Sequence, residues 1–182
     1  MLFEDLTWLF TNSNHNRNIV KLNFNEAALL YKTTRQSWGN ILEIGRYNGG
    51  STMILHAASH DSRKIYSVDL INRVDKIVAQ HLTERVIFMD QDSKIKIHTV
   101  FGLIFIDGNH SPEGVQADID THWENLDVDG YAVFHDAIGV SPGKDYWSGV
   151  KKATDTLINK NFAAKVDSAG SLLVLRKTGE LK

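Results

Sequence analysis

The sequence predicts a three-layer α/β fold, in which a sheet of mostly parallel strands is covered by helices on both faces. From residue 40 onward, short apolar segments alternate with stretches of helical periodicity, the pattern of repeated strand–helix–strand units. Residues 103–106 read Leu-Ile-Phe-Ile without interruption, as expected for a central strand buried on both faces. Near the C-terminus only residues 167–170 separate two apolar segments, so a hairpin should make the last strand antiparallel to its neighbour.

The expected elements can be placed along the chain from these patterns. Seven strands are predicted, at residues 40–44, 64–69, 85–89, 102–107, 130–135, 162–167 and 171–176. Helices are predicted at residues 24–37, 51–59, 72–82, 93–97, 112–125 and 147–160. Asn25, Ser51 and Ser111 are the predicted N-caps of three of these helices, and Pro112 suits a first helical position.

The N-terminal segment, residues 1–39, is predicted to be helical and to precede a single domain formed by residues 40–182. This segment could lie over a ligand crevice as a lid, or it could cover one edge of the sheet. We expect the choice of substrate to be made by this segment and by the loop at residues 137–147.

Composition limits the classes of function. The 182 residues carry a net charge of −2, which gives no basic footprint for nucleic acid. Because there is no cysteine, disulfides and thiolate metal sites are excluded. The N-terminus lacks the pattern of a signal peptide, and no apolar run reaches the ~20 residues of a membrane span. We therefore expect a cytoplasmic protein whose partner is a small molecule, and the sequence leaves open whether it forms a homodimer.

A glycine-rich turn after the first predicted strand is the first candidate ligand site. Gly45 and Gly49 permit positive φ or close approach of a ligand to the backbone, and Ser51 opens the following helix. Tyr47 stands where the dinucleotide fingerprint requires glycine, which argues against NAD. Glu43, just before the turn, would repel phosphate and suits an amino group or a cationic ligand. A tight turn that binds nothing is the alternative for this stretch alone.

Acidic residues at or near the ends of the first five predicted strands are the second candidate. One such acid usually caps a helix or a turn, but ligands of open α/β sheets bind at the carboxyl ends of strands, so five acids on one rim indicate a site. Asp69 lies near the ~20-residue offset from the glycine turn at which an acid binds a ribose diol. The acids are Glu43, Asp69, Asp92, Asp107 and Asp136.

Two histidines accompany the last two of these acids, because His110 follows Asp107 closely and His135 directly precedes Asp136. The two carboxylates could bind a hard divalent cation through oxygen. Either imidazole could act as a general base near neutral pH. Each histidine alone would more simply be a hydrogen-bonded surface residue, but their joint occurrence at adjacent strand ends favours a functional role.

Taken together, these motifs resemble class I S-adenosylmethionine-dependent methyltransferases. The likeness is greatest to the group that includes macrocin-type sugar O-methyltransferases and cephalosporin hydroxylase-like proteins. The stretches that carry the resemblance are residues 42–45, 49–51, 67–69, 105–111, 113–115, 118 and 129–136.

The resemblance implies a Rossmann-like, seven-stranded sheet with the last strand reversed, and it assigns roles to residues. The glycine turn, with Glu43, Gly45, Tyr47, Gly49 and Ser51, would surround the methionine part of the cofactor. Asp69 would hold the ribose hydroxyls, and Asp92 and Ser93 would lie beside the adenine. Asp107 would contact both the cofactor and a divalent cation, Mg²⁺ or Mn²⁺, shared with His135 and Asp136, and His110 would be the catalytic base.

The expected activity is methyl transfer to an oxygen of a small polar acceptor, such as a sugar hydroxyl. Metal-dependent relatives often carry Glu where this chain has His135, and an imidazole at that position favours Mn²⁺ over Mg²⁺. Two alternatives stay open: a binding protein that kept the fold without catalysis, and, less favoured, an NAD-dependent oxidoreductase.

Overall fold

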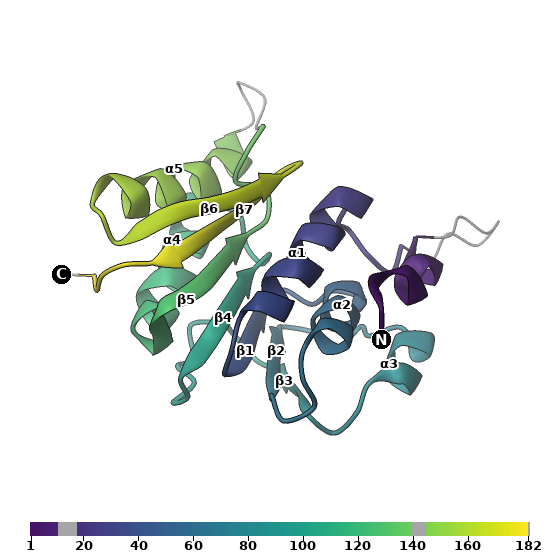
Figure 1. Ribbon diagram of the computed structural model, residues 1–182. Helices are drawn as coiled ribbons and strands as arrows, with labels where there is room; N and C mark the ends of the chain where they lie inside the picture. The colour runs from purple at the N-terminus through teal and green to yellow at the C-terminus, as the bar shows by residue number, and fades with distance from the viewer. Residues whose placement is uncertain (11–17, 140–144, 182) are drawn as a thin grey trace.

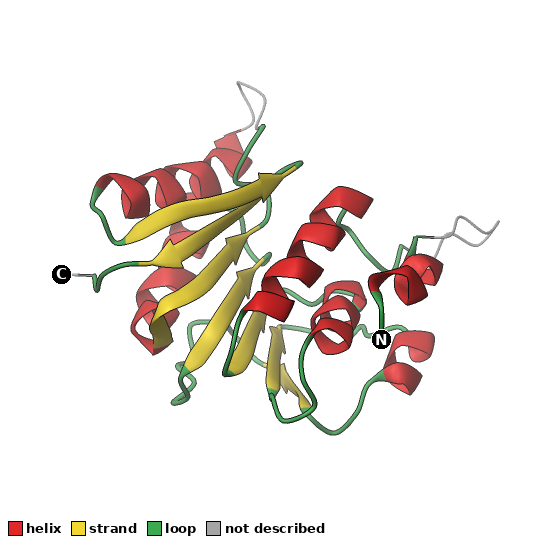
Figure 2. Cartoon of the chain, viewed as in Figure 1, coloured by secondary structure: helices red, strands yellow, loops and turns green. Residues whose placement is uncertain are grey.

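A computed structural model of the chain describes residues 1–10, 18–139 and 145–181, and it has the predicted three-layer α/β architecture (Figures 1 and 2). The strands are β1 (Asn40–Ile44), β2 (Ile65–Asp69), β3 (Val86–Asp90), β4 (Phe101–Ile106), β5 (Leu126–Phe134), β6 (Ala163–Ala169) and β7 (Leu172–Lys177). The α-helices are α1 (Phe24–Gln36), α2 (Gly50–Ala58), α3 (Lys76–His81), α4 (Pro112–His122) and α5 (Asp145–Asn159). Two 3₁₀ helices are η1 (Phe3–Leu9) and η2 (Trp123–Asn125).

The seven strands form one sheet in the order β3-β2-β1-β4-β5-β7-β6. Strands β1 to β5 pair in parallel, whereas β7 is antiparallel to both β5 and β6, so the prediction of a reversed last strand is confirmed. The chain order reverses between β1 and β4, which lie side by side at the middle of the sheet. Such a switch point leaves a crevice at the carboxyl ends of the strands, where open α/β sheets bind their ligands.

Two apolar cores lie on the two faces of the sheet because side chains alternate along each strand. In β4, Leu103 and Phe105 point into the core beneath α1 and α2, whereas Ile104 and Ile106 point into the core beneath α4 and α5. Leu30 of α1 belongs to the first core, so α1 covers the face of the sheet and not its edge (Figure 1).

Three predictions of local structure are wrong. Residues 93–97 form turns instead of a helix, because the carboxylate and the carbonyl of Asp92 accept hydrogen bonds from the backbone N–H groups of Lys94 and Ile95. The N-cap of α1 is Asn23, not Asn25, and its side chain accepts from the N–H groups of Asn25 and Glu26. The N-cap of α2 is Gly49, not Ser51.

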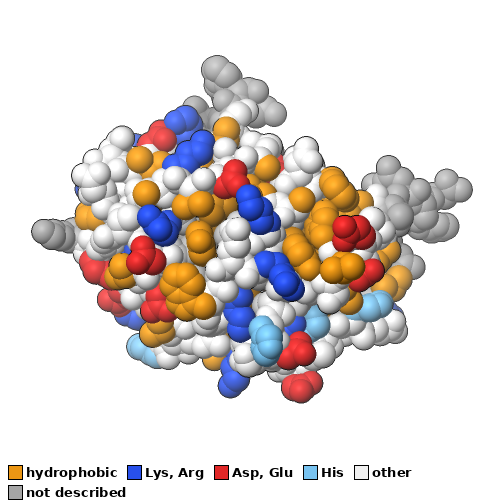
Figure 3. Space-filling model, viewed as in Figure 1, with side chains coloured by type: hydrophobic (Ala, Val, Ile, Leu, Met, Phe, Trp, Pro, Cys, Tyr) orange, Lys and Arg blue, Asp and Glu red, His pale blue; other side chains and the backbone are white. Residues whose placement is uncertain are grey.

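Other predictions of local structure are confirmed. Ser111 caps α4 by accepting a hydrogen bond from the N–H of Gly114, and Pro112 occupies the first turn. The part of the predicted loop 137–147 at residues 140–144 lies outside the described residues. On the face shown in Figure 3, acidic and basic side chains are interspersed with apolar ones. Among the described residues, no helix is both long enough and apolar enough to cross a membrane.

A candidate site at the carboxyl ends of the strands

A cavity of about 790 Å³ lies at the carboxyl ends of the strands, a volume within the usual range for small-molecule sites. It is lined by residues at or just after the ends of β1, β2, β4 and β5, namely Gly45, Asp69, Asp107 and Asp136. Of the residues predicted to form a site, Tyr47, Asp92, Ser93, His110 and His135 also line it. The structure therefore brings most of the predicted rim into one cavity.

The surrounding backbone leaves room only for glycine at position 45. Its φ is +90°, and a Cβ atom at this position would lie 2.1 Å from the carbonyl oxygen of Asp107. No other residue type fits without moving the end of β4. The turn then continues through Tyr47, which also has positive φ (48°) and donates its backbone N–H to the Asp69 carboxylate at 2.9 Å. The glycine turn is thus joined to the ends of both neighbouring strands.

Glu43 does not contact the cavity, contrary to its predicted role. Its side chain is fully buried, and its two oxygens accept hydrogen bonds from the hydroxyls of Ser51 (2.5 Å), Thr52 (2.6 Å) and Ser67 (2.6 Å). Burial raises the pKa of Glu43, and these hydrogen bonds offset only part of that effect. Neither Gly49 nor Ser51 lines the cavity: Gly49 caps α2, and Ser51 faces Glu43. Glu43, Gly49 and Ser51 therefore support the conformation of the turn without lining the cavity.

Replacing Glu43 with Ala should therefore destabilise the fold. The variant leaves three buried hydroxyls without their acceptor, at about 1–3 kcal/mol for each unsatisfied group, so we expect the free energy of unfolding to fall by at least about 3 kcal/mol. Urea unfolding followed by circular dichroism measures this loss. Glu43→Gln is the matched control, because the amide oxygen still accepts hydrogen bonds, and it should lose less. Equal stability of the Ala variant and the wild type would show that this hydroxyl cluster does not support the turn.

Asp69 lines the cavity at the end of β2 and is held on both of its oxygens. Oδ2 accepts from Tyr47 N–H, and Oδ1 accepts from Ile71 N–H at 3.2 Å and forms an ion pair with Arg73 at 3.2 Å. A carboxylate offers about four lone-pair sites, so it retains capacity for hydroxyl donors of a ligand. Its position next to the glycine turn agrees with the predicted role toward a ribose, which stays a prediction.

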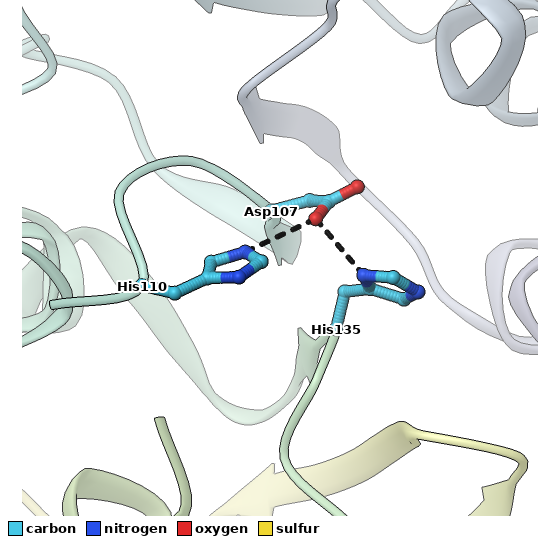
Figure 4. Close-up of side chains that lie close together, drawn as sticks. All are labelled: Asp107, His110 and His135. Carbon is cyan, nitrogen blue, oxygen red and sulfur yellow. Dashed lines mark ion pairs between the residues drawn. The ribbon is translucent and has the colours of Figure 1, made fainter. Parts of the chain in front are cut away.

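The ends of β4 and β5 bring together two imidazoles and two carboxylates, and Figure 4 shows three of these four side chains, those of Asp107, His110 and His135. His110 Nε2 lies 3.3 Å from Asp107 Oδ1, and His110 Nδ1 lies 3.2 Å from Asp136 Oδ2. His135 Nδ1 lies 3.0 Å from the same Asp107 oxygen. His110 therefore bridges the two carboxylates, while His135 approaches Asp107 from the other side.

The charges of this cluster stabilise one another. Burial alone would lower the pKa of His110, but its contacts with Asp107 and Asp136 outweigh burial and raise the pKa to about 9. The same balance raises the pKa of His135. Burial would raise the pKa of each aspartate, but the imidazoles lower both instead. At neutral pH His110 is thus an imidazolium, which neutralises part of the negative charge.

A metal ion could be held by a different set of ligands from the one predicted. One carboxylate oxygen and two imidazole nitrogens, from Asp107, His110 and His135, all lie within 4.8 Å of one another. Asp136, predicted as a ligand, is not in this group. Mg²⁺ prefers oxygen ligands, so a donor set with two imidazoles does not fit magnesium and suits a transition metal such as Mn²⁺.

Glu26 is the main residue of the cavity wall that the sequence analysis missed. It lies in the first turn of α1, is buried, and accepts hydrogen bonds from the N–H (2.7 Å) and the hydroxyl (2.9 Å) of Ser171. Its other oxygen lies 3.6 Å from His135 Nε2. The imidazole of His135 is therefore flanked by Asp107 and Glu26. The available sequence signal, Asn23 three residues before Glu26, marks a capping box and indicates only a helix start.

Comparisons with known proteins agree with this architecture. The sequence model of the protein family described as "Methyltransferase domain" matches residues 42–137, more than half of the 182 residues. No curated protein matches the chain.

Similar solved structures include SAH-bound methyltransferase PaMTH1 from Podospora anserina, with a TM-score of 0.68 and 15% identity over 97% of this chain and 87% of that one. The O-methyltransferase NovP has a TM-score of 0.67 and 13% identity, over 90% of this chain and 84% of that one. The N-methyltransferase NodS from Bradyrhizobium japonicum WM9 has a TM-score of 0.64 and 16% identity, over 84% of this chain and 94% of that one. At such identities the likeness shows the fold.

Proposed function

The chain belongs to the methyltransferase domain family, and from this premise we propose that it methylates a hydroxyl oxygen of a small polar acceptor, using S-adenosylmethionine. The observation that carries the proposal is the position of His110, whose imidazole lines the cavity between two carboxylates, beside the turn at Gly45. A base at this position suits a hydroxyl acceptor, which must lose its proton as it is methylated.

The cavity offers separate places for the parts of the cofactor. The turn at Gly45 and Tyr47 would surround the methionine part, and Asp69 would accept hydrogen bonds from the ribose hydroxyls. Ser93, after β3, would lie beside the adenine. Asp107 follows β4, the strand next to β1, and its carbonyl oxygen lies against Gly45. The transferable methyl group would therefore face the cluster of His110 and Asp107.

Catalysis would depend mainly on alignment. S-adenosylmethionine, when bound, would supply the methyl group to the acceptor oxygen, and the electron pair of the carbon–sulfur bond would stay on sulfur. His110 takes the hydroxyl proton, and Asp107 and Asp136 hold the ring in place and stabilise its charge. Because His110 carries a proton at neutral pH in the free site, it must release this proton before it can act as a base, and the positive charge of a bound sulfonium would favour the release. Holding donor and acceptor in line supplies most of the rate gain.

Binding of a divalent cation is a second role for the same side chains, and the three ligand atoms that lie close together favour it. Asp107, His110 and His135 would hold it, and it would lower the pKa of a bound acceptor hydroxyl. His110 cannot be both ligand and base, because each role uses the lone pair of an imidazole nitrogen. Metal dependence of the activity therefore distinguishes the two arrangements.

The class of acceptor is part of the proposal. We favour a sugar hydroxyl, because residues 105–111 and 129–136 resemble the macrocin-type group. The similar folds of the O-methyltransferase NovP and the N-methyltransferase NodS leave the acceptor atom open, so the base at His110 is the argument for oxygen. A binding protein without catalysis would share the cavity but release no S-adenosylhomocysteine when offered S-adenosylmethionine and sugar acceptors.

Cofactor binding can be tested by thermal unfolding. We expect S-adenosylhomocysteine at about 100 times its Kd to stabilise the chain by about 2.7 kcal/mol, whereas NAD leaves the melting temperature unchanged. The physical reason is the turn at Gly45, whose continuation through Tyr47 replaces the glycine that a dinucleotide pyrophosphate requires. Stabilisation by NAD and not by S-adenosylhomocysteine would overturn the proposed function.

The role of Asp69 toward the ribose gives a second prediction. Asp69→Ala should weaken binding of S-adenosylhomocysteine by roughly 1–3 kcal/mol, the usual range for hydrogen bonds to a charged group. Titration calorimetry measures the change, and Asp75→Ala, which removes the N-cap carboxylate of α3, is a control for local loosening near β2. An Asp69 variant that is folded and binds with wild-type affinity would exclude this carboxylate from the site.

A further inference from the structure

Glu26 closes the capping box of α1, but that role uses only one of its two carboxylate oxygens. Oε2 accepts the backbone N–H of Asn23 at 2.8 Å. Oε1 instead accepts the N–H (2.7 Å) and the hydroxyl (2.9 Å) of Ser171, which lies 145 residues further along the chain. Only 4% of the surface of Glu26 is exposed. The carboxylate therefore joins α1 to the turn between β6 and β7, which a capping box alone does not require (Figure 1).

The turn between β6 and β7 has no side chain at the point where α1 approaches it. Gly170 has a φ of +55°, and a Cβ atom at this position would lie 2.4 Å from Glu26 Oε1 and 2.7 Å from Asn23 Nδ2. Glycine is thus required both for the conformation of the turn and for the approach of the carboxylate. The contact between the two elements depends on the backbone of the turn as well as on the side chain of Glu26.

Ser171 extends this contact to the end of β5. Its hydroxyl donates to Glu26 and at the same time accepts the backbone N–H of Asp136 at 3.3 Å, since a hydroxyl can be donor and acceptor together. Its carbonyl oxygen accepts the N–H groups of Ala137 (2.9 Å) and Ile138 (3.2 Å). Three consecutive backbone N–H groups after β5 are therefore held by one residue, which Glu26 holds in turn.

The first of these three residues, Asp136, has a backbone conformation that needs such support. Its φ is +56°, in the left-handed region that side chains other than glycine rarely occupy. Residues in such conformations persist where the surrounding structure holds them, and they gather at functional sites. The carboxylate of Asp136 lies 3.2 Å from His110 Nδ1. A backbone that relaxed at Asp136 would turn this carboxylate away from the imidazole.

From these contacts we propose that Glu26 and Ser171 are positioning residues of the catalytic cluster, which hold Asp136 in its left-handed conformation so that its carboxylate orients His110. The inference rests on the proposed function, since it assumes that His110 acts on an acceptor. Glu26 and Ser171 act through Asp136 and take no part in the proton transfer. Both lie outside residues 42–137, so segments before and after the part matched by the methyltransferase family complete the site.

Ser171→Ala tests the proposal, because it removes the hydroxyl between Glu26 and Asp136 but keeps the backbone groups of residue 171. In a crystal structure of this variant, the distance between Asp136 Oδ2 and His110 Nδ1 should exceed about 3.5 Å, the limit of a hydrogen bond. Turnover of sugar acceptors should fall by about 10-fold to 100-fold, the effect of a small misalignment. Affinity for S-adenosylhomocysteine should stay within a few-fold of the wild type, and Ser171→Thr, which restores a hydroxyl, should restore the contact and the turnover.

A double-mutant cycle shows whether the two residues act through one path. Glu26→Ala removes the acceptor of the Ser171 hydroxyl, so it should lower turnover in the same way as Ser171→Ala. If both act through Asp136, the double variant should lose little more turnover than the more impaired single variant. Ser168→Ala is the matched control, because it removes a hydroxyl from the same hairpin at a residue that does not line the cavity, and it should behave as the wild type.

The outcomes separate this inference from the proposed function. If the wild type neither binds S-adenosylhomocysteine nor methylates an acceptor, the proposed function fails, while the distance between Asp136 and His110 in Ser171→Ala still tests the positioning. An unchanged distance in that variant overturns the positioning whatever the turnover. Loss of cofactor affinity by the same factor as turnover, or full additivity in the cycle, also overturns it, because either result indicates a general loosening of the fold.

Discussion

Asp107→Asn is expected to reduce methyl transfer by about 1000-fold or more, equivalent to ~4 kcal/mol of transition-state stabilisation. Asp107 is the residue that both imidazoles of the cluster share, at 3.3 Å for His110 and 3.0 Å for His135. An amide in its place carries no charge, so it neither stabilises a protonated His110 nor binds a metal ion well. Both proposed arrangements of the site therefore lose their central group.

The same variant should bind S-adenosylhomocysteine within a few-fold of the wild-type Kd. The backbone of Asp107 supports the turn at Gly45, and this contact comes from its carbonyl group, which the substitution does not change. The measurement combines release of S-adenosylhomocysteine, in an assay with a panel of sugar hydroxyl acceptors, with calorimetry. Asp120→Asn, on the exposed face of α4, is the control for loss of a negative charge. Turnover within about 10-fold of the wild type would remove Asp107 from the catalytic group.

The sequence was sufficient to predict the cavity rim because one rule of α/β sheets connects distant positions. Parallel strands end at the same edge, so Asp69, Asp107 and Asp136 had to lie on one rim once the strands were placed. The hairpin predicted from residues 167–170 similarly determined the reversed strand β7, although residues 167–169 belong to β6 and the turn itself is at residues 170 and 171. These predictions depend on the period of the apolar residues and on the direction of the strands, and both can be inferred from a single sequence.

Contacts between side chains were not predictable in the same way. Glu43 was expected to face a ligand, but three hydroxyls that follow it on α2 and β2 turn its carboxylate inward. Glu26 reaches the site only because α1 packs across the face of the sheet, which places it 3.6 Å from His135. Neither packing leaves a periodic signal, so hydrogen-bond partners far apart in sequence appear only in the structure.

His110→Ala is expected to lower turnover by about 100-fold to 10,000-fold, the range for loss of a general base, without loss of cofactor affinity. The variant removes the His110 imidazolium, which lies between Asp107 and Asp136, so the two carboxylates then repel each other across the cavity. Folding should be checked by circular dichroism, and His81→Ala, which removes an exposed imidazole from α3, is a matched control. Turnover equal to the wild type would exclude His110 as a catalytic residue.

A chelator then distinguishes the two roles of His110. If His110 is the base, wild-type activity should be unchanged in EDTA, and added Mn²⁺ should not restore His110→Ala. If Asp107, His110 and His135 hold a metal ion, EDTA should abolish activity, and Mn²⁺ should restore it better than Mg²⁺ because the donor set contains two imidazoles. We expect the first result, because His110 already lies within 3.3 Å of both carboxylates and supplies the positive charge that a metal ion would otherwise bring. Loss of activity in EDTA that Mn²⁺ reverses would contradict this expectation and assign His110 as a ligand.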